Sequence, residues 1–76
     1  MKKQVKSKQE IITETLIVKS KLLPYTWRME WCLANDISLS TLHRYLNGQI
    51  ASFIIAEKLL ADIEAYIKQN NLVDAA

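Results

Sequence analysis

The segment from Ser38 to Gly48 constrains the fold more than any other part of the chain, because it carries the signals of a complete short helix. Ser38 suits the N-cap, since its hydroxyl can accept a hydrogen bond from a free amide of the first turn. Leu42, Tyr45 and Leu46 recur at i, i+3 and i+4 and so form one apolar face. Gly48 supplies the left-handed backbone that commonly ends a helix. The segment therefore predicts a helix of about three turns with one buried side.

The other face of this helix carries only hydrogen-bonding side chains. Ser40, His43, Arg44 and Asn47 follow one another at i, i+3, i+4 and i+7. A helix that is packed on one side and presents such groups on the other fits the major groove of DNA. The alternative is an ordinary surface helix whose outer face is polar, since capped amphipathic helices are common.

The residues before this helix predict a second short helix and a sharp turn. Pro24 ends the helix that precedes it, and Thr26 is the expected N-cap of a helix over Trp27–Asn35. Asn35-Asp36 are the two non-glycine types that best tolerate a left-handed backbone, and Ile37 then fills the angle between the helices. Two short helices joined by about three to four residues make a helix-turn-helix.

The stretch from Arg28 to Asn47 resembles the DNA-binding unit of Cro- and repressor-type phage and bacterial regulators. Those proteins often have a second helix of the form Ser-x-x-Thr-Leu-x-x-Tyr-Leu-Asn-Gly, a pattern that the residues from Ser38 to Gly48 follow closely. Cys32 takes the family's small position in the first helix. Asp36 departs from the pattern, because glycine is usual there, and Asn35 replaces an expected apolar residue. The resemblance implies a DNA-binding regulator of phage, plasmid or mobile-element type.

The remainder of the chain completes a helical domain. One glycine and one proline leave little turn material for a sheet, and half of the residues are hydrophobic, which is ample for a core. Wherever apolar residues repeat clearly along the chain, they do so at helical spacing. The predicted fold is therefore all-α, a small four-helix domain containing a helix-turn-helix. A flexible basic arm over residues 1–8 would precede the DNA-binding domain at 9–71, and a short tail would occupy 72–76. The expected helices are Lys8–Leu22, Trp27–Asn35, Leu39–Asn47 and Phe53–Gln69, the last capped by Ser52.

Charge is segregated along the chain. Residues 1–28 carry seven Lys or Arg and two Glu, whereas residues 29–76 carry three bases and six acids. The basic first part favours binding to a polyanion, and the acidic second part does not. Beside a helix-turn-helix, a lysine-rich arm indicates phosphate contacts, although a solubilising tail would have the same composition.

The predicted DNA contacts fall into two groups. Arg44 is the first choice for reading a base, because a guanidinium can bond both acceptors of a guanine. The predicted base-reading residues are Ser40, His43 and Arg44. The predicted phosphate-contacting residues are Lys2, Lys3, Lys6, Lys8, Arg28, Thr41 and Asn47.

Several classes of function find no support in the sequence. Cys32 is the single cysteine and His43 the single histidine, so neither a disulfide nor a metal site is expected, and no cofactor is implied. No carboxylate pair or nucleophile–base set is marked out, so we expect no enzyme. Neither a secretory signal nor a run of about 18 apolar residues is present. The expected location is the bacterial cytoplasm, at the nucleoid.

The predicted partners are double-stranded DNA and a second copy of the chain. One recognition helix reads few bases, and two-fold dimers reading two half-sites overcome this limit. Apolar residues of the last helix, Ile55, Leu59 and Tyr66, are candidates for the dimer interface, although they fit a monomer core equally well. The alternative functions are a protein-interaction module, such as an antirepressor, and an excisionase-like accessory factor that shapes DNA.

Overall fold

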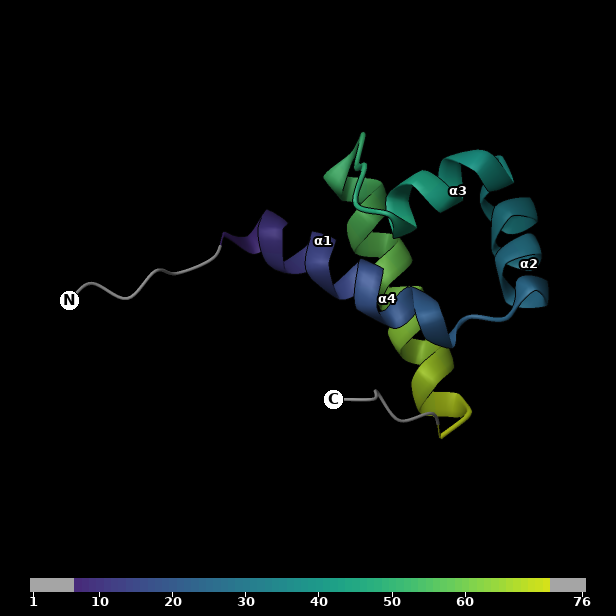
Figure 1. The fold of residues 1–76 in the computed structure, drawn as a ribbon. Coiled ribbons are helices and arrows are strands. Elements are labelled where there is room, and N and C mark those ends of the chain that lie inside the picture. Colours follow the sequence, from purple (N-terminus) through teal and green to yellow (C-terminus); the bar gives the residue numbers. More distant parts are fainter. Residues whose placement is uncertain (1–6, 72–76) are drawn as a thin grey trace.

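A computed structural model describes residues 7–71, and these residues are helical, with no strand among them (Figure 1). The elements are α1 (Lys8–Lys19), the 3₁₀ turn η1 (Ser20–Leu22), α2 (Tyr25–Asn35), α3 (Leu39–Leu46) and α4 (Phe53–Gln69). The prediction of a small all-α domain with four helices is confirmed. Among residues 7–71, no helix combines the length and the apolar character needed to cross a bilayer.

Helix α1 begins with a capping box that the sequence analysis did not identify. The Ser7 hydroxyl accepts from the Glu10 amide at 3.1 Å, and the Glu10 carboxylate accepts from the Ser7 amide at 3.3 Å. These two bonds satisfy amides that would otherwise lack a helical partner. Ser7 and Lys8 therefore belong to the folded domain, whereas the rest of the predicted arm and the predicted tail lie outside the described residues.

The predicted helix over Lys8–Leu22 is in fact two elements, because the chain tightens into η1 before Pro24. The Ser20 hydroxyl donates to the Ile17 carbonyl at 2.7 Å, and the Leu23 amide reaches only back to Ser20. A residue before proline is pushed away from helical backbone, so the chain extends at Leu23.

The predicted N-cap at Thr26 is wrong. Helix α2 begins at Tyr25, and the cap position is occupied by Pro24, whose carbonyl accepts from the Arg28 amide. Proline needs no amide partner and its φ of −73° already suits a helix start. Thr26 thus lies inside the first turn, and α2 starts two residues earlier than predicted.

The turn between α2 and α3 is confirmed where the sequence placed it. Asn35 is the last residue of α2, and Asp36 adopts the left-handed conformation with φ 55° and ψ 47°. The Ile37 amide then bonds the Cys32 carbonyl, and Ile37 packs against the core. Helices α2 and α3 therefore meet at a corner, which Figure 1 shows at the upper right of the view.

The core forms where α1 packs against α3 and α4, with α2 packed on α3. Leu59 is completely buried there, so it is a core residue, and its assignment to a dimer interface is wrong. Apolar residues occur on several sides of α4 because other helices cover more than one side of it. Ile55 and Tyr66, the other two candidates, are half-buried and keep part of their surface exposed. The most deeply buried large side chains are Leu16, Leu42, Leu59 and Ile63.

Candidate nucleic-acid interface

Helix α3 is fixed at both ends and along its inner face. Ser38 caps it as predicted, because its hydroxyl accepts from the Thr41 amide at 3.2 Å. Leu42, Tyr45 and Leu46 are buried, which confirms the predicted apolar face. After the helix, Gly48 has a positive φ of 93° and turns the chain toward α4.

The outer face of α3 is exposed and polar. Ser40, Arg44 and Asn47 are all exposed, and they lie on one side of the helix at i, i+4 and i+7. None of their side chains bonds another residue between positions 7 and 71. Their donors and acceptors are therefore available to a ligand that lies along α3.

His43 lies at the edge of this face and is turned partly inward. The residue is half-buried, and its Nε2 atom is buried with no hydrogen-bond partner among the residues that the structure describes. A base contact from this ring would therefore have to use Nδ1. The helical spacing that grouped His43 with Arg44 did not reveal this orientation.

The predicted phosphate-contacting residues do not form a single cluster. The Thr41 hydroxyl accepts from Ser38 at 2.9 Å beside the start of α3, and Lys8 at the start of α1 pairs with Glu57 of α4 at 3.1 Å. Arg28 bonds the carbonyls of Ser20 at 2.8 Å and Leu23 at 3.3 Å, so its guanidinium holds η1 against α2. Lys2, Lys3 and Lys6 lie outside the described residues.

Cys32, which takes the small position in the first helix, is buried in the core. Burial raises the pKa of its thiol by removing the thiolate from water. No group of three or more His, Cys, Asp or Glu side chains within residues 7–71 is placed to hold a metal ion.

The Tyr45 hydroxyl links α3 to the start of α4, a contact that the sequence did not predict. It accepts a hydrogen bond from the Ser52 amide at 3.0 Å, and Tyr45 is only 3% exposed. The residues are seven apart and lie across a turn, so no helical spacing signals the bond. It fixes the position of α3 relative to α4.

Replacing Tyr45 by phenylalanine should lower the free energy of unfolding by about 0.5–1.5 kcal/mol, because the Ser52 amide loses its acceptor. Tyr25→Phe is the matched control, since Tyr25 is 63% exposed and its hydroxyl bonds no described residue. Urea unfolding followed by circular dichroism measures both variants. Equal midpoints for the two variants would show that the bond contributes nothing.

Comparison with protein-family models, with curated proteins and with solved structures gives no match.

Proposed function

We propose that this chain is a sequence-specific DNA-binding regulator of transcription, with α2, the turn and α3 acting as its helix-turn-helix. The observation that carries the proposal is the exposed line of Ser40, Arg44 and Asn47 on a helix whose opposite face is buried. A rigid helix with unpaired donors and acceptors on its outer side suits the major groove, where base edges present complementary groups.

The side chains on α3 differ in the contacts they can make. Arg44 can donate two parallel hydrogen bonds to a guanine, and Ser40, one turn nearer the helix start, can bond a base edge. Asn47 lies at the end of α3, where a phosphate contact suits it better. Thr41 lies in the first turn, where helix amides and hydroxyls commonly meet phosphates.

Lysines would supply the part of binding that does not depend on sequence. Each phosphate that a protein neutralises releases condensed counterions, so such contacts strengthen binding to all DNA and make it sensitive to salt. We assign this role to Lys2, Lys3 and Lys6, and to Lys8, whose side chain is 80% exposed despite its pairing with Glu57. Arg28 contributes less directly in this proposal, since its guanidinium is engaged by backbone carbonyls.

Arg44→Ala and Lys3→Ala should weaken DNA binding in different ways. Loss of a two-bond base contact should cost about 1–3 kcal/mol on a selected site, with little change on random duplex DNA. Loss of a phosphate contact should weaken binding to both DNAs alike and lower the salt slope by about one. Binding isotherms at several salt concentrations, on a site selected from a random pool, measure both effects.

Lys68→Ala is the matched control for these isotherms. It removes one positive charge from the exposed last turn of α4, at the end of that helix opposite the α3 loop. The control should bind as the parent does. If Arg44→Ala weakened binding to selected and random DNA equally, Arg44 would be a phosphate contact, and the proposed reading face would be wrong.

A further inference from the structure

One side of α1 carries exposed apolar residues that repeat at the spacing of a coiled coil. Ile11 is 51% exposed and Val18 is 52% exposed, and the half-buried Thr15 lies between them. The three residues follow one another at i, i+4 and i+7, which is the spacing of the a and d positions of a heptad. The Thr15 hydroxyl donates to the Ile11 carbonyl at 2.7 Å, so it needs no further partner on this surface. We call these three residues the α1 seam.

Helix α1 packs on the rest of the domain through its other sides, where it lies across α4 (Figure 1). Ile12 and Leu16 are buried in the core that α1 forms with α3 and α4. Thr13 and Ile17 lie close to Gly48, just after α3. None of these four residues belongs to the α1 seam, so α1 can keep its place in the domain while the seam contacts another molecule.

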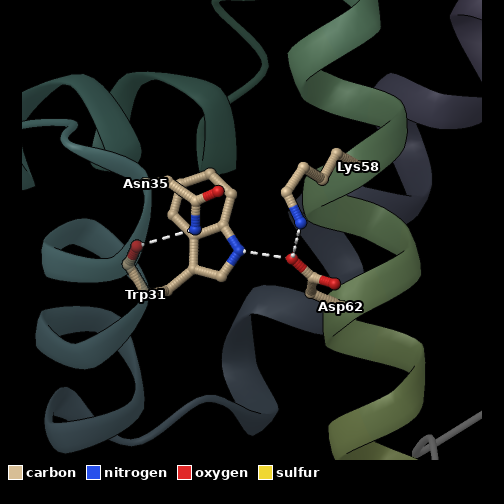
Figure 2. Close-up of polar contacts among 4 residues, drawn as sticks. All are labelled: Trp31, Asn35, Lys58 and Asp62. Carbon is tan, nitrogen blue, oxygen red and sulfur yellow. Dashed lines mark hydrogen bonds and ion pairs between the residues drawn. The ribbon is translucent and has the colours of Figure 1, made fainter.

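The side of α4 that faces α2 is occupied by the chain itself. Trp31 on α2 donates from Nε1 to the Asp62 carboxylate on α4 at 2.7 Å, and Lys58 reaches the same oxygen at 3.0 Å (Figure 2). The Asn35 side-chain amide donates to the Trp31 carbonyl at 2.9 Å. A second copy would have to displace this bridge to reach that side of α4, which favours α1 as the site of contact.

The charges beside the α1 seam complement each other when two copies of α1 lie antiparallel. Glu14 and Lys21 are seven residues apart, so they lie along the same edge of the seam, and both are exposed. A two-fold axis that lies between the two helices and crosses both at a right angle reverses their direction and brings equal edges together. Glu14 of each copy then lies beside Lys21 of the other.

A parallel arrangement of the two helices offers no such pair. In a parallel coiled coil, Glu14 would meet position 19 of the other copy, across the seam. Lys19 is engaged within its own chain, because it pairs with Glu64 of α4 at 3.9 Å and its side chain is only 18% exposed. The charges therefore favour the antiparallel arrangement.

The apolar residues match in the same antiparallel arrangement. When the axis passes midway between Thr15 and Val18, Thr15 of each copy faces Val18 of the other, and Ile11 reaches the half-buried Leu22 of η1. A surface hollow lies at this axis and can receive Val18 of the other copy, and its lining residues are Glu14, Thr15, Val18 and Lys19. A surface that complements itself in this way is the requirement of a two-fold dimer.

We propose that two copies of this chain associate through the α1 seam in this antiparallel, two-fold arrangement. The α1 seam replaces Ile55 and Tyr66 of α4 as the dimer interface. The polar face of α3 takes no part in it, so both recognition helices stay available. The need for two copies rests on the proposed DNA-binding function, since one recognition helix reads few bases, whereas the association itself requires no DNA.

Sedimentation equilibrium without DNA, at tens of micromolar, tests the proposal with Glu14→Lys and Lys21→Glu. The parent chain should be a dimer. Each variant alone should associate at least about tenfold more weakly, because two pairs of opposite charge become two pairs of like charge. An equimolar mixture of the two variants should associate as the parent does, because both pairs in the mixed dimer then join opposite charges.

Val18→Glu tests the apolar part of the α1 seam, since it places two carboxylates beside the two-fold axis. This variant should be monomeric at the same concentration. Leu33→Glu is the matched control, because it makes a similar change at a residue of α2 that is 79% exposed and lies outside the seam. The control should remain a dimer, and circular dichroism should show all variants folded.

A monomeric parent chain, a mixture that fails to restore association, or a Val18→Glu variant that remains a dimer would overturn the proposed interface. A monomer that binds DNA would reject this interface alone. A dimer with the expected responses to substitution that binds no DNA would reject only the proposed function.

Discussion

Replacing Leu59 by alanine should lower the free energy of unfolding by about 2–5 kcal/mol. Leu59 is completely buried in the core, so truncation leaves a cavity as well as losing hydrophobic burial. A domain of this length has a stability of about 4–11 kcal/mol, so the loss is a large fraction of the total. Urea unfolding followed by circular dichroism measures the change at a single protein concentration.

Ile54→Ala is the control for Leu59→Ala, on the same helix and with a similar loss of volume. Ile54 is 82% exposed, so its truncation should change the stability of the monomer by less than about 0.5 kcal/mol. The pair of variants therefore compares a buried position with an exposed position on one helix. Similar unfolding midpoints for the two variants would contradict the assignment of Leu59 to the core.

Replacing Gly48 by alanine should destabilise the domain by about 1–3 kcal/mol. Gly48 has a φ of 93°, which side chains with a Cβ rarely adopt. A Cβ at this position would also lie 3.1 Å from Ile17 Cδ1 and 3.3 Å from Thr13 Cγ2. The unfavourable backbone conformation and the crowding against α1 both lower the stability of the variant.

A double variant separates the effect of the backbone conformation from the effect of the crowding. Ile17→Val removes the Cδ1 atom that a Cβ at position 48 would meet most closely. Thermal unfolding should therefore show a smaller cost of Gly48→Ala in the Ile17→Val background than in the parent, with the backbone cost remaining. An unchanged melting temperature for Gly48→Ala in the parent would show that neither the backbone conformation nor the crowding destabilises the variant.

The sequence predicted α3 and its surroundings best, because the signals there are local. The Ser38 cap, the buried Leu42 and Tyr45 and the positive φ of Gly48 all depend on residues within a few positions of one another. The left-handed turn at Asp36 was predictable for the same reason. The exposed positions of Ser40, Arg44 and Asn47 on α3 followed from helical spacing, whereas the partly inward orientation of His43 did not.

The features that sequence reasoning missed depend on contacts between distant elements. The hydrogen bond from Trp31 to Asp62 joins residues 31 positions apart, and nothing in their local sequence pairs them. Arg28 was predicted as a phosphate contact because charge alone does not reveal its bonds to the carbonyls of Ser20 and Leu23. Leu59 was misplaced because the apolar stripe of α4 is wide, and only the packing of α1 shows which part is covered.

The most direct test of the proposed function is a titration of the isotopically labelled protein with a duplex that carries a site selected from a random pool, at low salt, followed by NMR. The account predicts that the largest chemical-shift changes occur at Ser40, Arg44 and Asn47 on α3, and that they shrink as salt is added. Shifts confined to residues of other helices, such as Glu30 and Tyr66, or no shifts at any residue, would contradict DNA binding through α3.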